Sequence, residues 1–329
     1  MTQYGTPPTA KPAVLARFAA ALLGRPVRRW APEASLPADA AEGFALGPDL
    51  TLWRLPVGWV RIRERHRRLE PGIDWTPDDF RFPMMMADSR ITEWLTCTAW
   101  LIAHPEATIL VDTGEAPDFG EASHFEGAGA ATRWIYPRII DCQSARDSSL
   151  PTMLAQTGRT MEEVDLCVLT HLHSDHVGNV PRLAGRTRIV TSELETQHLA
   201  RSGRLPFKLP QDGRVRLVKG QEGAPDRTFA SACPLVTRGD VRLVPTPGHT
   251  IGHASVLIDL GDRRVLLAGD AGFSDADVAR GAIPGIVERL DATRDTYARL
   301  GAEHDRGTLI LYTHDPANSA KLRGAFKTV

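Results

Sequence analysis

The stretch THLHSDHVGN, residues 170–179, constrains this chain more than any other part of the sequence. It places His171, His173, Asp175 and His176 within six positions, at the end of the apolar run VDLCVLT. Core packing gives no reason to put three histidines and an aspartate behind a β-strand. Imidazole and carboxylate groups are the ligands that zinc and similar divalent ions prefer. The stretch therefore predicts a metal site that distant residues complete.

Three later residues are the best candidates to complete that site, because each also comes at the end of an apolar run. His249 follows VRLVPTPG, Asp270 ends RVLLAGD and His314 follows GTLILYT. Ligands in α/β sheets bind outside the carboxyl ends of strands, so these ends can meet at one point. Gly248 lies beside His249 and removes a Cβ where the backbone must come close to the site.

The spacing inside the stretch indicates that it can serve two ions. His171 and His173 are two residues apart, so both side chains point the same way from an extended segment. Asp175 and His176 lie beyond them, where the chain turns towards a helix, and can reach a second ion. Gly178 leaves room for the backbone to crowd this site.

The remaining histidines are expected to be structural, because a lone histidine is more often a core residue than a ligand. This group contains His66, His104, His124, His198 and His304. His253 follows His249 by four residues, and we expect it to support a neighbouring group or the fold.

The composition is that of an ordinary globular protein, with 42% hydrophobic residues, 24% charged residues and a net charge of −1. This balance gives no reason to expect a nucleic-acid partner. No apolar run approaches the roughly 18 residues of a membrane span, so we expect no membrane association. The arginine-rich run 61–68 is interpreted as a solvated face.

The four cysteines form no CxxC pair, which indicates neither a disulfide framework nor a thiolate metal site. Their use is typical of a reducing compartment, and we expect a cytoplasmic protein.

The sequence divides into an arm, residues 1–50, and a catalytic domain, residues 51–329. The arm is rich in Pro and Ala and has one amphipathic-helix pattern, formed by Leu15, Phe18, Ala19 and Leu22. We expect this helix to pack on the body or on a partner, as in a homodimer through the arm.

The patterning is strand-like from Thr51, and strands and helices alternate from Met161 onwards. Strands are predicted at 51–62, 97–104, 107–114, 164–170, 187–192, 215–220, 241–246 and 307–315, with a hairpin over 254–270 that turns at Gly261-Asp262. Helices are predicted from Ser192, through a capping box with Glu195, and over 287–302. An irregular insert at 115–150 and the run FPMMMAD, residues 82–88, are candidates for an apolar substrate groove, and ordinary core is the alternative for the methionines.

The motif HxHxDH, followed by a later His, Asp and His, resembles the metallo-β-lactamase superfamily, and ILVDTG at 109–114 is similar to its first-half strand end. The resemblance implies an αββα sandwich, an α/β fold of two mixed sheets flanked by helices. It implies that Asp112 orients the histidine loop. It also implies a first ion held by His171, His173 and His249, a second held by Asp175, His176 and His314, and Asp270 as the bridge.

Within the superfamily, the motifs are most similar to those of the N-acyl-homoserine lactonases. Glyoxalase II-like thioesterases carry a helical domain after the last strand, whereas only residues 315–329 follow His314. The ending THDP also resembles the lactonases. One departure concerns the substrate pocket: those lactonases carry a tyrosine three residues after the bridging aspartate, and this chain has Phe273.

The resemblance implies a binuclear hydrolase that opens a lactone or ester ring by attack of a metal-bridging hydroxide. An N-acyl-homoserine lactone, a quorum-signal molecule, is one candidate substrate, and Asp175 is the expected proton carrier. Zinc is the first choice for both ions, with Mn, Fe and Co as alternatives. The alternative functions are an aryl esterase or phosphotriester hydrolase, and a mononuclear iron enzyme that oxidises thiols.

Overall fold

The computed structural model describes residues 15–16, 18–20, 36, 39–69, 81–119, 121, 124–125, 130–144, 146–202, 209–210, 212–219 and 222–329. Within the arm, Leu15, Phe18 and Ala19 are helical, while Leu22 of the predicted pattern lies outside the described residues. The ring of Phe18 packs edge-on against Phe82, with centroids 5.9 Å apart. The arm helix therefore touches the body of the protein, and its predicted use in a dimer stays a prediction.

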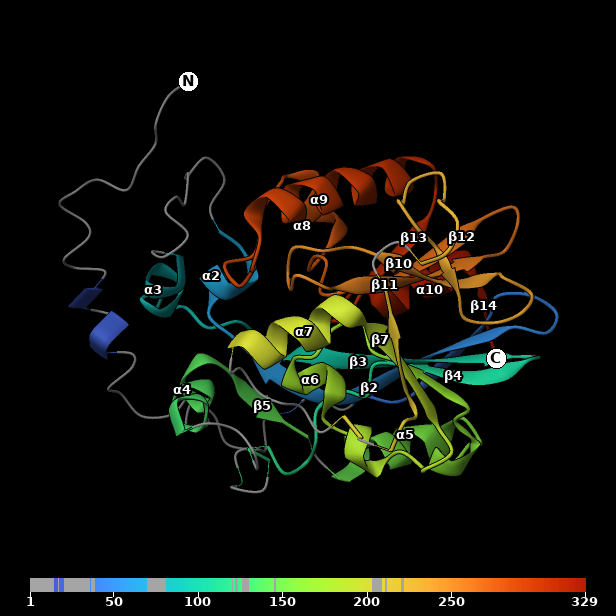
Figure 1. The fold of residues 1–329 in the computed structure, drawn as a ribbon, viewed down its shortest axis with the longest axis horizontal. Coiled ribbons are helices and arrows are strands. Elements are labelled where there is room, and N and C mark those ends of the chain that lie inside the picture. Colours follow the sequence, from blue (N-terminus) through green and yellow to red (C-terminus); the bar gives the residue numbers. More distant parts are fainter. Residues whose placement is uncertain are drawn as a thin grey trace.

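Two β-sheets stack face to face (Figure 1). In the order β14-β1-β2-β3-β4-β6-β7-β8, the first sheet consists of β14 (Lys327–Thr328), β1 (Glu42–Ala45), β2 (Thr51–Arg61), β3 (Leu95–His104), β4 (Ala107–Val111), β6 (Leu166–Val168), β7 (Arg188–Ser192) and β8 (Val215–Val218), with β5 (Asp141–Gln143) paired to β2. In the order β13-β12-β11-β10-β9, the second consists of β13 (Leu309–Tyr312), β12 (Arg264–Gly269), β11 (Ala254–Asp259), β10 (Val241–Pro245) and β9 (Cys233–Pro234).

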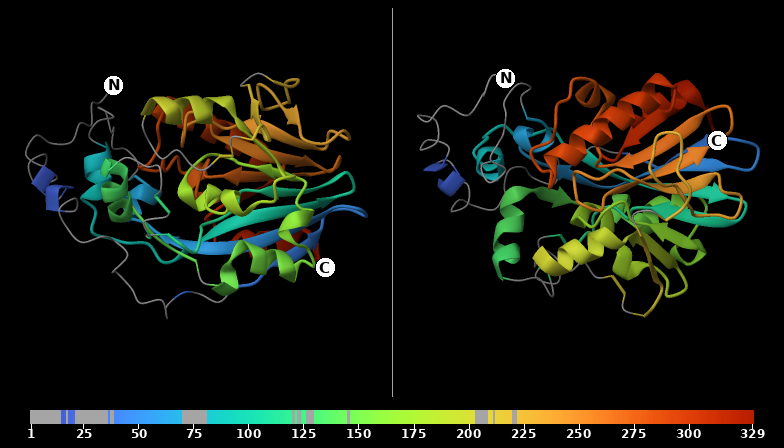
Figure 2. Two further views of the ribbon diagram at one scale, coloured as in Figure 1. Left: turned by 60° about the horizontal axis from the view of Figure 1, so that its bottom comes forward. Right: turned by 45° about the horizontal axis from the view of Figure 1, so that its top comes forward.

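Helices cover the outer faces of both sheets, with α5 on the first and α8 and α9 on the second (Figure 2). The α-helices are α2 (Glu64–Arg67), α3 (Arg81–Met86), α4 (Ala130–Ile139), α5 (Leu150–Gln156), α6 (Ser174–Val177), α7 (Glu193–Ser202), α8 (Asp275–Ala279), α9 (Leu290–Asp305) and α10 (Asn318–Ala325). Short 3₁₀ turns occupy Arg146–Ser148, Met161–Glu163 and Val180–Arg182.

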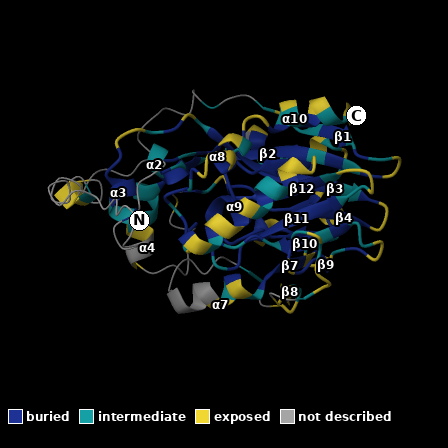
Figure 3. Cartoon of the chain, turned by 90° about the horizontal axis from the view of Figure 1, so that it is seen from above, coloured by how far each residue is buried: buried dark blue, intermediate teal, exposed yellow. Residues whose placement is uncertain are grey.

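The central core fills the space between the two sheets. Leu52, Trp100 and Ile109 of the first sheet pack with Val256 and Leu267 of the second. Figure 3 shows most of the central strands buried, whereas exposed segments lie on α9 and α10. Apolar faces of sheets and helices must be buried against one another, and two sheets between helix layers satisfy that requirement. The predicted αββα sandwich is confirmed.

The predicted strand pairs occur with the expected turns. β3 and β4 pair antiparallel from Trp100↔Val111 to His104↔Ala107, and β11 pairs with β12 around the turn at Gly261. Among the described strands, four short ones were not predicted: β9 and β14, of two residues each, and β1 and β5. β1 lies inside the stretch assigned to the arm, so the sheet begins before residue 51, and β5 lies inside the insert. Both are too short for a period to show, and they form by pairing with β2.

The capping box predicted at the start of α7 is wrong. The helix begins at Glu193 as expected, but the carboxylate of Glu195 turns away from Ser192. It accepts the hydroxyl proton of Thr250 and the N–H of Gly252, the latter at 3.0 Å. A buried carboxyl group must find partners, and tertiary donors replace the local one here.

The arginine-rich run 61–68 is not the solvated face that we predicted. Arg61 pairs with the buried carboxylate of Asp141 at 2.9 Å, and Arg63 donates to the carbonyl of Arg138 at 2.9 Å. Arg67 is buried beside Glu93. A buried guanidinium group is tolerated when carboxylate or carbonyl oxygens accept its N–H groups. The contacts of Arg61 and Arg63 therefore attach β5 and α4 to the sheet.

Candidate metal centre

All seven predicted ligands meet at one end of the sandwich. They arrive from the ends of β6, β10, β12 and β13, as the strand-end argument predicted. The first group is a trio of histidines. His173 Nδ1 lies 3.0 Å from His171 Nε2 and 3.0 Å from His249 Nε2, which brings three ring nitrogens to one point.

Asp270 lies between this trio and the remaining ligands. One carboxylate oxygen, Oδ1, is 3.4 Å from His176 Nε2. The other, Oδ2, is 3.5 Å from His249 Nε2 and 3.4 Å from His314 Nε2. Asp175 Oδ2 completes the second group at 3.3 Å from His314 Nε2. Asp270 therefore occupies the position of a bridge.

The donors present fit a pair of divalent ions. His176 Nε2 and Asp270 Oδ1 are buried and have no hydrogen-bond partner among the described residues. A buried polar atom without a partner costs about 1–3 kcal/mol, which an ion between them would recover. Imidazole nitrogens and carboxylate oxygens are the donor set of zinc and similar metals.

Asp112 holds both the histidine loop and one of its rings. The carboxylate accepts the backbone N–H and the hydroxyl of Thr170, each at 2.8 Å, and the Nδ1–H of His176 at 2.8 Å. Its φ is 57°, in the left-handed region that non-glycine residues rarely adopt. These contacts place Asp112 where the resemblance implied, behind the loop.

Hydrogen bonds behind the rings of His171 and His314 leave Nε2 of each ring free to face the site. The Thr170 hydroxyl is committed to Asp112, so His171 Nδ1–H donates to it at 3.1 Å. His314 Nδ1–H donates to the carbonyl of Thr96 at 2.8 Å. Such contacts fix the tautomer and the orientation of a ligating histidine.

His253 has a supporting role, as predicted. Its Nδ1–H donates to the carbonyl of Thr246 at 3.1 Å, and its Nε2 accepts the backbone N–H of Asp270 at 3.1 Å. Both ring nitrogens are used, so the ring positions the backbone of Asp270.

The two glycines singled out in the sequence both stand at close approaches. A Cβ on Gly178 would lie 2.4 Å from the backbone nitrogen of Ala116. Gly248 has a φ of 141°, and a Cβ there would lie 2.6 Å from the Cα of Thr293. Each allows a ligand-bearing loop to pack against its neighbour.

Burial and neighbouring charged groups together determine the protonation state of each titratable side chain at the site. Burial lowers the pKa of His171 and of His249 well below the ordinary value, which keeps both rings neutral. Burial opposes ionisation of Asp175, but His176 and His314 outweigh it and lower its pKa to about 2. Burial opposes the charged form of His176 and His314 as well, but the nearby carboxylates, Asp270 first, outweigh it and raise the pKa of both rings, that of His314 to about 10. Without an ion, the site therefore combines the neutral rings of His171 and His249 with two charged rings and an ionised carboxylate, and metal binding would displace the protons of the charged rings.

A pocket of about 60 Å³ opens onto these ligands. Phe273 lies in its wall, stacked on His314 with centroids 5.7 Å apart. The insert supplies Tyr136, Ile139 and Ile140. The methionines of α3 are buried elsewhere and do not line this pocket, which favours the core interpretation of FPMMMAD.

Sequence reasoning missed His66 as a residue of this site. It was assigned to the structural histidines, yet its side chain lines the pocket together with His173 and Asp175. Burial, and then the nearby His173, lower the pKa of His66 to about 3, so the ring is neutral. No local signal marks it, because α2 is short and only the packing of the arginine-rich run brings it to the site.

The other histidines expected to be structural lie away from the pocket lining. His104 Nε2 faces Asp240 at 3.2 Å, His124 Nδ1 lies 3.7 Å from Asp118, and His304 is exposed. The side chain of His198 lies outside the described residues.

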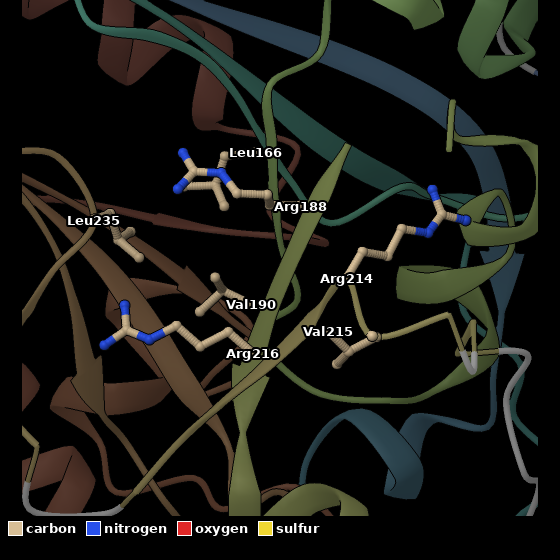
Figure 4. Close-up of a pocket in the computed structure, with 8 residues that line it drawn as sticks. Leu166, Arg188, Val190, Arg214, Val215, Arg216 and Leu235 are labelled. Carbon is tan, nitrogen blue, oxygen red and sulfur yellow. The ribbon is translucent and has the colours of Figure 1, made fainter. Parts of the chain in front are cut away.

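A separate cavity of about 220 Å³ lies near the beginnings of β6 and β7, away from the ligand-bearing strand ends. Figure 4 shows Arg188 and Arg216 on one side of β7 and Arg214 directed away from them. Arg216 pairs with Glu222, and Arg214 pairs with Asp212 at 3.1 Å. Two of the three guanidinium groups are thus already neutralised.

Two further sequence expectations can be compared with the structure. Cys97, Cys142, Cys167 and Cys233 are all buried and free. Among the described helices, none combines the length and the apolar character needed to cross a membrane.

Comparison with known proteins identifies the family. The model of the metallo-beta-lactamase superfamily matches residues 92–314. A probable metallo-hydrolase of Mycobacterium tuberculosis is 32% identical over 244 residues, covering 68% of this chain and 75% of that protein. The N-acyl homoserine lactonase AiiB of Agrobacterium fabrum is 33% identical over 242 residues, covering 68% and 81%.

The fold is similar to that of a solved N-acyl homoserine lactone hydrolase with the product N-hexanoyl-L-homoserine bound at its catalytic metal center. The TM-score is 0.60 at 18% identity, and the match covers 86% of this chain and 96% of that chain. The family match spans the histidine loop, Asp270 and His314, which are the residues that the structure brings together. The chain belongs to the metallo-beta-lactamase superfamily.

Proposed function

We propose that the protein is a two-metal hydrolase that opens lactone rings, with N-acyl-homoserine lactones among its candidate substrates. The convergence of seven donors, two carboxylates and five histidines, on one pocket carries this proposal. The lactonase relatives support the choice of a cyclic ester over other substrates. Zinc is the proposed metal, because structural and catalytic zinc sites use this donor set.

The seven donors would hold two ions, which when bound would make a water nucleophilic at neutral pH and polarise an ester carbonyl. The chain's own contribution to proton transfer comes from Asp175. The carboxylate is ionised at neutral pH, which is the form that can accept the proton that the attacking water gives up. Returning that proton to the ring oxygen as it leaves balances the hydrolysis, in which one water is consumed.

The pocket walls define which substrates can approach. Val60, Ile62 and Ile286 form an apolar surface, to which His66 and Tyr136 add polar groups. Tyr136 also ties α4 to the histidine loop, since its hydroxyl lies 2.9 Å from Ser174 Oγ. We propose that this wall holds the acyl chain of the substrate beside the ligands.

A second candidate function is hydrolysis of aryl esters or phosphotriesters. Phe273 favours it, because the ring stacks on His314 and presents no hydroxyl to a carbonyl oxygen. An apolar ring beside the reacting group suits a substrate with an aromatic leaving group.

A substrate screen of the zinc-loaded full chain tests these alternatives. The panel contains acyl-homoserine lactones, unsubstituted lactones, aryl esters and phosphotriesters, with the Asp270→Ala variant as a blank. We expect turnover of lactones that the blank lacks. Turnover of phosphotriesters alone would replace the proposed function with the second one.

A further inference from the structure

Cys97 is a fully buried cysteine of β3 that lies beside the second group of ligands. Its sulfur, a carboxylate oxygen of Asp175 and a ring nitrogen of His314 all lie within 4.8 Å of one another. The carbonyl of the preceding residue, Thr96, accepts the Nδ1–H of His314 at 2.8 Å. The strand that fixes this histidine ring therefore also carries the sulfur.

The backbone is irregular opposite Cys97. β2 and β3 pair at Pro56↔Thr98 and at Trp59↔Thr96, so two residues of β2 oppose Cys97 alone. Bulges of this kind occur beside active sites, where they re-aim side chains. The carbonyl of Val57 leaves the ladder and accepts the N–H of Glu115 at 3.0 Å.

The separation of these atoms is close to what one ion requires. Sulfur binds zinc at about 2.3 Å, and nitrogen or oxygen at about 2.1 Å, so two such ligands of one ion are at most about 4.4 Å apart. The observed separations, within 4.8 Å, exceed this limit by no more than about 0.4 Å. In a tetrahedral site two such ligands are about 3.6 Å apart, so binding would draw the sulfur of Cys97 towards the other two donors.

We propose that Cys97 binds the second ion as a thiolate ligand, alongside Asp175 and His314. The inference rests on the proposed two-ion site. Binding replaces the S–H bond by a sulfur–metal bond and releases the proton to solvent. The unpartnered His176 Nε2 and Asp270 Oδ1 are independent evidence that buried donors are directed at an ion here.

A sulfur ligand has a consequence for metal choice. Thiolate is a soft ligand that favours zinc over manganese and other hard ions. The second position should therefore discriminate against manganese more strongly than a site of nitrogen and oxygen donors alone.

The competing interpretation is that Cys97 only packs. It belongs to an apolar cluster with Leu95, Phe119 and Phe273. Burial raises the pKa of the Cys97 thiol well above its ordinary value, so without an ion the group is a neutral thiol. Packing alone predicts no contact with metal, which separates the two interpretations.

The test is the absorption spectrum of the full chain loaded with two equivalents of cobalt. Thiolate bound to cobalt gives an intense near-ultraviolet charge-transfer band, which nitrogen and oxygen ligands do not give. The test variants are Cys97→Ser and Cys97→Ala. The control variant is Cys167→Ala. Cys167 is equally buried, but it lies in β6 and packs with the apolar residues under α5. X-ray absorption of the zinc-loaded wild type adds a readout that needs no variant.

We expect the band in the wild type and in Cys167→Ala, its loss in both Cys97 variants, and a sulfur scatterer at about 2.3 Å from zinc. Absence of the band and of the sulfur scatterer in the fully loaded wild type would overturn the inference, as would survival of the band in Cys97→Ser. Lactone hydrolysis is measured on the same samples. Activity without a sulfur–metal bond would refute the role of Cys97 and leave the proposed function standing.

Discussion

The carboxylate of Asp112 accepts the Nδ1–H of His176 at 2.8 Å, and this contact turns Nε2 of that ring towards Asp270. The same carboxylate holds Thr170, whose hydroxyl in turn accepts the Nδ1–H of His171. The carboxylate of Asp112 therefore orients one ring of each ligand group: His176 directly, and His171 through the hydroxyl of Thr170.

Asp112→Asn is expected to weaken metal binding without unfolding the protein. The amide keeps the size of the side chain but loses the charge that orients His176, and such supporting contacts are typically worth 10–100-fold in metal affinity. The measurement is zinc affinity by chelator competition, with circular dichroism as the control for folding. An unchanged affinity would show that the contact is incidental.

Asp175→Asn is expected to reduce kcat for lactone hydrolysis by about 10²–10⁴-fold, the usual worth of a positioned proton carrier. Asparagine can neither accept a proton nor carry the charge that the lowered pKa of Asp175 maintains. Steady-state kinetics are compared at equal metal content, measured on each sample. Near-wild-type turnover would remove Asp175 from the proposed proton path.

Phe273→Tyr should shift selectivity towards acyl-homoserine lactones. A hydroxyl at this position adds a donor near the ligands, and a well-aimed donor of this kind contributes about 10²–10³-fold to kcat. We expect a gain nearer tenfold in kcat/KM for the lactone over an aryl ester, because the ring stays stacked on His314. An unchanged ratio would mean that Phe273 does not face the reacting carbonyl.

Glu195 should make stability fall with rising pH. Burial raises its pKa from 4.5 to about 7, so between these values the folded state binds more protons than the unfolded state. The free energy of unfolding then decreases as pH rises through this window, by on the order of 3 kcal/mol in total. Glu195→Gln removes this titrating group and should reduce the slope by the share of one carboxyl group, while Glu115, whose pKa burial raises to about 8, keeps its own share.

The measurement for Glu195 is urea unfolding at several pH values between 4.5 and 8. Glu193→Gln is the matched control, because Glu193 begins the same helix but is only partly buried. The control should keep the slope of the wild type. A wild-type slope in Glu195→Gln would assign the pH dependence to other groups.

The sequence predicted which side chains would meet at one end of the sandwich because the signal for them is local. His171, His249, Asp270 and His314 each follow an apolar strand, and the ends of strands in a layered sheet converge. The hairpin around Gly261 was predictable for the same reason, since alternation and turn residues lie next to one another in the chain.

What the sequence did not show depends on contacts between distant segments. His66 reaches the pocket because Arg61 and Arg63 are held by the insert, and no spacing rule encodes that contact. Cys97 resembles any small apolar residue of a buried strand until the bulge in β2 and the ring of His314 are placed beside it. Glu195 matched a local capping rule, but Thr250 and Gly252 offered better partners.

The number of metal ions per chain tests the central claim most directly. Elemental analysis is made on protein purified without added metal, and again after dialysis against zinc, for the wild type and for Asp270→Ala. The two-ion site predicts two ions per wild-type chain after loading and fewer in the variant, which lacks the bridging carboxylate. A reproducible value near one in the wild type, unchanged by added zinc, would contradict the account.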